Sequence, residues 1–584
     1  MEPIRIQRRS VLLFSLAAAI SGCAPKQLVL NSSIGDIANA YIEKWAGFYP
    51  TRAYGEGRKA SAGAFEVLSQ ERIAAWVREN EILSEKLAPF LTSPDVETQL
   101  DAAMLARQAK WEIELWTQAD ALSAEPELYS DFISQALTHL LVRDDLDAAE
   151  KAAAVSARLA GVKELCKIGL NQLKDANKER AQGALGVLRQ TALFYRNGLP
   201  GIIAGWGLDG GGEKIQTAAR EAAVSVDALA DHIDANIIPS ASSPVAYGAA
   251  TYARRLEIYA DGAVTPEELS ALAAAEIDRV RAEMIEVSRR WRTQNGGGDS
   301  STAGESDEAV LAAALAAMED DRPASSAEML EDFTTLTDKA EAFIREKGLA
   351  TLPDPRTLYI AMSPAHLASV AFGGVYPTGP FSPQSDTLFL LPYVPDDAPA
   401  RQKEGFYRSY NDHFNEMIIS HEMFPGHYMQ AKTGVLHAPA WRMLFGNDIY
   451  AEGWGSFSEI LMLNAGWGGG DLLTRLAHLR KRIENATRAY VSVQVHTKDW
   501  NKGDVMNFAT TRGLLAPQFA ENLWDRVVNS PFQIITYFLG YHGFVELWES
   551  EQKRLGDGFS TRNFVDGVLR AGTAPVHRLA PLLK

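Results

Sequence analysis

The sequence predicts a mainly α protein with one minor β element, and three observations support this prediction. Residues 30–290 contain successive segments with apolar side chains at helical spacing. Residues 351–395 are instead rich in Pro and Gly and hold two short β-prone runs. From Ala400 the helical pattern returns and continues almost to the C-terminus. The 584 residues, 46% of them hydrophobic, suffice for a large core in one two-lobed unit or in two to three domains.

The first 23 residues have the features of a bacterial export signal. Arg5, Arg8 and Arg9 precede the apolar stretch Val11–Ile20, which is shorter than the roughly 20 residues that span a bilayer as a helix. Small residues then lead to Cys23. The block resembles a lipoprotein signal peptide, in which Cys23 is lipidated and becomes the new N-terminus. The alternative is an ordinary secretory signal with an incidental cysteine, and the paired arginines leave Sec and Tat export both open.

Lipidation of Cys23 would anchor the mature protein to a membrane of the cell envelope, facing the periplasm or the exterior. Ala24 stands where inner-membrane retention would require Asp, so we expect the outer membrane. Beyond residue 24, no segment is long and apolar enough to span a bilayer. The other cysteine, Cys166, lies in an amphipathic stretch and is expected to be buried, so no intramolecular disulfide is predicted.

An N-terminal helical region is predicted over residues 24–293. Its clearest helices are Ile73–Leu87, Val96–Leu122, Leu128–Leu141, Asp147–Leu173 and Ala218–Ile238. A further helix begins after Thr265, with Pro266 in its first turn. The Gly- and Ser-rich residues 294–308 indicate a flexible loop. Residues 309–584 then form the region that carries the chemistry, and we expect the two regions to make one unit with a cleft.

After the predicted loop, Ser325–Lys347 is helical and residues 351–395 carry the β element. The two β-prone runs are Thr357–Ala361 and Thr387–Leu391. The second run directly precedes the segment richest in histidine. It is interpreted either as an edge strand that pairs with an extended peptide or as part of a structural hairpin.

A predicted helix over Gln402–Gln430 carries the first candidate metal ligand. Apolar residues recur along it at spacings of three and four, and His421 falls on the same face. Glu422 follows, about 100° further round the helix. A buried histidine followed by glutamate is how a zinc-peptidase helix begins, because the histidine binds the metal and the glutamate activates water.

The next histidine, His427, is six positions later and would lie about 240° away on a straight helix. Pro425 and Gly426 stand between the two histidines. Proline removes a backbone donor and disfavours helical geometry before it, and glycine accepts unusual backbone angles. We therefore predict a bulge or kink that turns His427 back toward His421.

A catalytic zinc site needs about three protein ligands, so a third should come from another element. Glu452 and Glu459 lie seven residues apart and share a helix face; Glu459 either orients a ligand or is solvated. His496 and Tyr537 are candidate hydrogen-bond donors to a reacting oxyanion. Arg488 and Arg512 either bind a substrate carboxylate or form surface ion pairs.

These motifs together resemble a family of bacterial proteins called domain of unknown function 885, which is placed among the zincin-like metallopeptidases. The specific similarity covers Tyr376–Gly540. The residues that carry it are His421-Glu-Met-Phe-Pro-Gly-His427 with Tyr428 and Gln430, Glu452-Gly453-Trp454, Arg408-Ser-Tyr-Asn411, and Pro531, Gln533 and Tyr537. One difference is that the family often has Asp four residues before the histidine matching His496, where this chain has Ser492.

The resemblance implies a large helical, two-lobed zincin-like metallopeptidase with the β element beside its cleft. It implies Zn²⁺ as cofactor, held by His421, His427 and Glu452, with Glu422 as general base. The expected reaction is hydrolysis of peptide bonds in short peptides. Two alternatives stay open: a non-catalytic surface lipoprotein that binds peptides or glycans, and a zinc-dependent amidase acting on cell-wall peptides. The formal net charge of −17 argues against nucleic acid as a partner, and no feature indicates an oligomeric state.

Overall fold

The computed structural model of the chain describes residues 33–208, 212–295, 305–363, 374–395 and 398–583. The predicted signal peptide with Cys23, and residues 296–304 of the predicted loop, lie outside these ranges. Within them the chain is mainly helical with one three-stranded sheet, which confirms the predicted fold class. In the same ranges, no helix has the length and apolar character needed to span a membrane.

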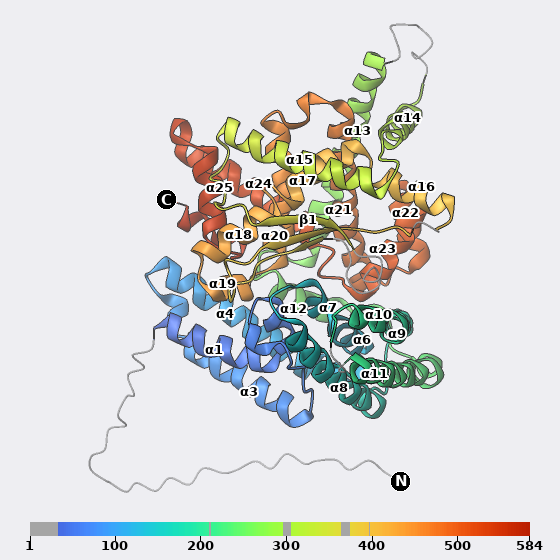
Figure 1. Cartoon of the computed structure of the whole chain (residues 1–584). Coiled ribbons are helices and arrows are strands. Elements are labelled where there is room, and N and C mark those ends of the chain that lie inside the picture. The colour runs from blue at the N-terminus through green and yellow to red at the C-terminus, as the bar shows by residue number, and fades with distance from the viewer. Residues whose placement is uncertain (1–32, 209–211, 296–304, 364–373, 396–397, 584) are drawn as a thin grey trace, which may run out of the picture.

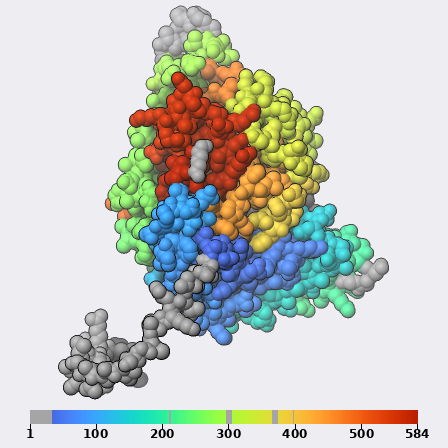
Figure 2. Space-filling model, turned by 90° about the vertical axis from the view of Figure 1, so that its left-hand side faces the viewer, coloured from blue at the N-terminus to red at the C-terminus, as the bar shows by residue number. Residues whose placement is uncertain are grey.

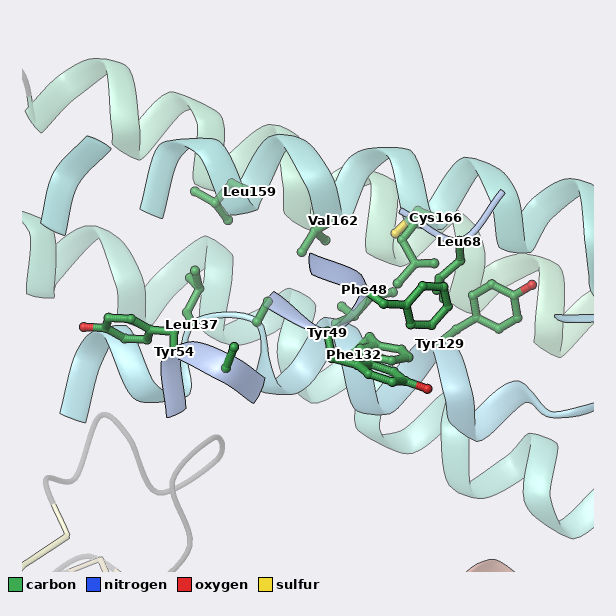
Figure 3. Packing of buried hydrophobic residues seen from close by; sticks show 14 of the residues in the cluster. Phe48, Tyr49, Tyr54, Leu68, Tyr129, Phe132, Leu137, Leu159, Val162 and Cys166 are labelled. Carbon is green, nitrogen blue, oxygen red and sulfur yellow. The ribbon is translucent and has the colours of Figure 1, made fainter. Parts of the chain in front are cut away.

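The N-terminal lobe occupies the lower part of Figure 1, coloured blue to teal. Figure 3 shows part of its hydrophobic core, where Phe48, Tyr49 and Phe132 pack together. Cys166 is buried in this core, as predicted, and burial raises the pKa of its thiol to about 12, so it is not a reactive nucleophile. The helices of this lobe are α1 (Ile34–Phe48), α2 (Pro50–Gly55), α3 (Gln70–Leu87), α4 (Val96–Ile113), α5 (Ala121–Ala124), α6 (Pro126–Gln135), α7 (Thr138–Val142), α8 (Ala148–Gln172), α9 (Lys178–Leu193), α10 (Leu199–Ala204) and α11 (Gly212–His232).

Local signals account for several helix boundaries. Asp147 caps α8, and its carboxylate accepts from the Glu150 backbone while Glu150 reaches back to the Asp147 N–H. Thr265 and Glu268 form the same reciprocal pair at the start of α13 (Pro266–Asn295), the helix predicted to begin after Thr265. The predicted helix Val96–Leu122 is wrong only at its C-terminal end. Helix α4 continues as a π-helix over Glu114–Gln118, and Asp120 then adopts a left-handed conformation at φ 48° and breaks the helix.

The C-terminal lobe also includes two helices that precede the predicted loop. The helices α12 (Ala249–Tyr259) and α13 pack with α21 (Leu472–Lys498) around a second hydrophobic core. A third core surrounds the sheet and the helices that carry the candidate ligands. The other helices here are α14 (Asp307–Asp320), α15 (Ser326–Lys347), α16 (Ala400–Ser409), α17 (Asp412–Glu422), α18 (His427–His437), α19 (Ala440–Leu444), α20 (Asp448–Asn464), α22 (Lys502–Thr511), α23 (Pro517–Asn529), α24 (Thr536–Leu555) and α25 (Thr561–Arg570).

The two lobes pack directly against each other through α1, α4 and α19. Figure 2 shows the blue N-terminal helices against the orange and red segments of the C-terminal lobe. Phe445, which follows α19, is buried in the core of the N-terminal lobe. Arg107 of α4 donates a hydrogen bond of 2.6 Å to the Phe445 carbonyl, so α19 and α4 are joined by both packing and polar contacts.

The sheet has the strand order β1-β3-β2, with β1 (Leu358–Met362), β2 (Gly374–Tyr376) and β3 (Thr387–Leu391). The central strand β3 pairs in parallel with β1, matching Leu358 to Thr387, and antiparallel with β2, matching Val375 to Phe389. The interpretation of Thr387–Leu391 as an edge strand is therefore wrong, because both of its edges are already paired. The short strand β2 was not predicted.

Candidate metal centre

The segment between the two candidate histidines is a complete helix break rather than the predicted bulge or kink. Helix α17 ends at Glu422, and α18 begins at His427, with a cis peptide bond before Pro425. A Cβ at Gly426 would lie 1.8 Å from the His421 carbonyl oxygen, so the chain turns this tightly only because residue 426 is glycine. Trp454 of α20 fixes the turn by donating 2.8 Å to the Pro425 carbonyl.

This break brings His421, His427 and Glu452 together. One ligand atom from each lies within 4.8 Å of the other two. The Nε2 atoms of His421 and His427 are each 3.5 Å from Oε2 of Glu452. Two ligands about 2.1 Å from a tetrahedral zinc ion would be about 3.4 Å apart, so the donor types and spacings fit zinc.

Glycines on α20 make the approach of the helices possible. A Cβ at Gly453 would lie 2.4 Å from Cα of Gly540, so α20 and α24 touch backbone to backbone next to Glu452. A Cβ at Gly455 would lie 2.7 Å from the His421 ring. The sequence motif Glu452-Gly453-Trp454 thus supplies a candidate ligand, a close helix crossing and the support of the turn at Pro425.

Glu459 lies two turns beyond Glu452 on the same face of α20 and connects two histidines. Its Oε1 is 2.8 Å from Nδ1 of His421, and its Oε2 is 2.9 Å from Nδ1 of His478 on α21. All three side chains are buried. A carboxylate on Nδ1 keeps the proton there and leaves Nε2 free to bind a metal, which is the arrangement common around metal-binding histidines. His478 was not predicted, because it belongs to no motif and only the tertiary packing of α21 on α20 places it.

Opposite charges dominate the electrostatics of this cluster. Burial lowers the pKa of His421, but the carboxylates of Glu452 and Glu459 outweigh burial and raise it to about 10. Burial raises the pKa of the Glu452 carboxyl, but hydrogen bonds to both imidazoles hold it well below its ordinary value. The pKa of Glu459 is lowered to about 2, because His421 and His478 likewise outweigh burial. The carboxylates therefore remain ionised and favour positive charge between them.

The cluster opens into a cavity of about 460 Å³. Glu422 and Tyr537 line this metal cavity together with the three candidate ligands. Gly374 and Val375 of β2 form part of its wall, so the small sheet does lie beside the site, and Glu56 is contributed by the N-terminal lobe. The Tyr537 hydroxyl accepts a hydrogen bond of 3.3 Å from Gln533, and burial followed by the Glu452 charge raises its pKa, so it stays protonated as a donor.

Three of the predicted residues have other surroundings. His496 does not line the metal cavity, and its Nε2 lies 2.9 Å from the Val527 carbonyl. Its ring stacks on Tyr247 and Tyr252, and burial lowers its pKa to about 4. The Ser492 hydroxyl forms its hydrogen bonds with the Tyr252 hydroxyl and the Pro531 carbonyl. Arg512 forms a surface ion pair with Asp278. Arg488 lies over the Tyr537 ring at 5.4 Å and pairs with Glu484.

Fold and site together define a mainly helical, two-lobed protein with a two-histidine, one-carboxylate candidate metal centre in the C-terminal lobe. A bacterial family described as protein of unknown function, DUF885, matches residues 50–583. The chain belongs to this family.

Two solved structures share the fold over almost their whole length. One is from Shewanella oneidensis and is described as a "putative lipoprotein of unknown function"; it is 18% identical, with a TM-score of 0.79, over 94% of this chain and 99% of that one. The other is from Colwellia psychrerythraea and is described as a "putative lipoprotein"; it is 16% identical, with a TM-score of 0.74, over 94% and 98%. No protein among the curated sequences matches.

Proposed function

We propose that this protein is a zinc-dependent metallopeptidase that hydrolyses peptide bonds in short peptides. One observation carries the proposal: two imidazole nitrogens and a carboxylate oxygen from three separate segments converge within 4.8 Å, and Glu422 lines the same cavity. His421, His427 and Glu452 would hold the ion. Zinc in such a site polarises a carbonyl group and lowers the pKa of water.

The chain's own residues would perform the proton transfers. Glu422 accepts a proton from the attacking water and returns it to the leaving amine, so that a C–O bond replaces the C–N bond. Tyr537 donates a hydrogen bond to the oxygen on which negative charge develops. Glu459 acts at a distance by keeping the His421 ring in place, and His478 supports Glu459 from the other side. His496 takes no part in this proposal, because both of its ring nitrogens face backbone groups outside the cavity.

The proposal includes export and anchoring through Cys23. The N-terminal residues have the composition of a lipoprotein signal, and two proteins with the same fold carry the description "putative lipoprotein". The protein would then act in the cell envelope, with the outer membrane as the expected location. Labelled palmitate tests the lipid anchor independently of the proposed catalysis. The wild-type chain should incorporate the label, and Cys23→Ala should not.

The first test is metal content together with peptide hydrolysis. We expect about one zinc per chain in protein purified without chelators, and cleavage of a mixed peptide library read by mass spectrometry. Treatment with a chelator should remove the zinc and the cleavage together, and added zinc should restore both. Zinc without cleavage would instead favour a binding protein, and cleavage that survives complete zinc removal would contradict the proposal. Cleavage restricted to cell-wall peptides would favour the amidase alternative.

A second test concerns Glu459, which touches no ligand atom directly. In Glu459→Gln, only one amide oxygen remains to accept from two imidazoles, so His421 loses a defined tautomer and orientation. We expect zinc affinity to fall by about 10- to 100-fold, measured by competition with a chromophoric chelator. Glu549→Gln, an exposed carboxylate on α24, is the matched control and should bind zinc like the wild type. Unchanged affinity in Glu459→Gln would show that the contact has no positioning role.

A further inference from the structure

A second cavity of about 500 Å³ adjoins the metal cavity, and Lys481 lines both. Its walls come from α16, the start of α17, one face of α21, the segment 513–516 and α23. On α21 the lining residues Ala477, Lys481, Glu484 and Arg488 recur at helical spacing, so a single helix face runs along the cavity. The metal cavity and this second chamber therefore share Lys481 as a wall residue.

The second chamber is strongly basic although the whole chain is acidic. Four cationic side chains line it, Arg480, Lys481, Arg488 and Arg526, against one lining carboxylate, Glu484. We call the four the basic cluster. Arg480 is paired with Glu319, and Arg488 with Glu484. Among the residues that the structure describes, neither Lys481 nor Arg526 has a carboxylate within ion-pair distance.

The surroundings of Lys481 and Arg526 make it energetically unfavourable to bury these two cations without an anion. Both are half-buried, and Phe406, Phe414 and Phe519 form apolar parts of the wall. Burial, and then the charge of Arg488, lower the pKa of Arg526. A buried cation is unfavourable unless an anion compensates it, and a low-dielectric wall strengthens the attraction to that anion. The chamber therefore favours a negatively charged group from outside the chain.

The basic cluster also lies directly beside the reacting groups. Lys481, Arg488 and Arg526 all lie over the Tyr537 ring, at 5.7, 5.4 and 6.0 Å. Arg526 further donates 2.7 Å to Gln533, which donates to the Tyr537 hydroxyl. An anion bound here would be held at a fixed distance from the candidate metal centre.

We propose that the basic cluster binds a carboxylate of the substrate, and that this is the C-terminal carboxylate of a short peptide. The protein would then release a short C-terminal fragment by adding water across one peptide bond. This inference rests on the proposed function and names its substrate class.

The test compares three N-acetylated pentapeptides that differ only at the last residue: leucine as the free acid, leucine as the carboxamide, and glutamate as the carboxamide. We expect kcat/KM for the free acid to exceed that of the leucine carboxamide by about 10- to 100-fold, since a charge-assisted bidentate contact is lost. Arg526→Gln and Lys481→Gln should each remove most of this preference, mainly through KM. Arg289→Gln, an exposed ion-paired arginine on α13, is the matched control and should keep it.

The three peptides also separate the two sources of a carboxylate. If the glutamate carboxamide is cleaved as well as the free acid, the cluster recognises an acidic side chain and the C-terminal assignment is overturned. Equal cleavage of all three peptides would overturn the inference and leave the peptidase proposal intact. Failure of all three to be cleaved would count against the peptidase proposal alone. In that case, calorimetric binding of the same peptides to Glu422→Gln decides the inference. The inference requires the free acid to bind more tightly than the two carboxamides.

Discussion

Glu422→Gln is expected to lose peptide hydrolysis by about 10³-fold while still binding one zinc per chain. The substitution keeps the size and shape of the side chain but removes its ability to accept a proton. A positioned general base contributes about 10²- to 10⁴-fold to such a reaction. Glu422 lines the metal cavity but does not belong to the set of three converging ligand atoms, so the metal should remain. Rates measured on the free-acid pentapeptide and zinc measured by mass spectrometry check both halves of the expectation.

The control for Glu422→Gln is Glu331→Gln, which changes an exposed carboxylate on α15. It should hydrolyse peptide at the wild-type rate. Undiminished hydrolysis by Glu422→Gln would remove this residue from the mechanism. Loss of zinc from the same variant would show that Glu422 is a ligand rather than a base, and the roles of Glu422 and Glu452 would then need to be exchanged.

The fold class followed from the sequence because its signals are local. Helical periodicity and capping pairs such as Thr265 with Glu268 depend on residues three or four apart, and they recur where the structure has helices. The order of the strands in the sheet, in contrast, does not depend on local signals. Thr387–Leu391 has the composition of a strand, but its central place depends on β2, a strand of only three residues that carries no pattern of its own.

The candidate site was predictable to the extent that it is encoded in short motifs. Pro425 and Gly426 indicated that the chain must turn between His421 and His427, although the turn is a full break between two helices. The partners of these residues were not predictable, because they come from distant segments. His478 meets Glu459 only through the packing of α21 on α20, and Arg488 meets Tyr537 only through the packing of α21 on α24.

Gly455→Ala is expected to weaken zinc binding by more than about 100-fold, although the substitution adds a single methyl group. The new Cβ would lie 2.7 Å from Cε1 and Nε2 of His421, about 1 Å inside ordinary contact distance. The imidazole has little room to move, because it is buried and its Nδ1 is held by Glu459. Metal–ligand distances tolerate changes of only about 0.2 Å, so a ring displaced by several times that amount can no longer share an ion with His427 and Glu452.

Gly186→Ala provides the matched control, because this glycine lies within α9 and an added Cβ meets nothing within 4 Å. It should keep zinc and activity and gain about 1 kcal/mol of helix stability. Chelator competition gives the zinc affinity of each variant, and thermal unfolding of the metal-free proteins shows whether Gly455→Ala is still folded. A folded Gly455→Ala protein with wild-type zinc affinity would mean that the His421 ring does not bind the metal where the structure places it. The same ring position places Nε2 of His421 3.5 Å from Glu452. That result would therefore also mean that His421 and Glu452 do not bind the same ion.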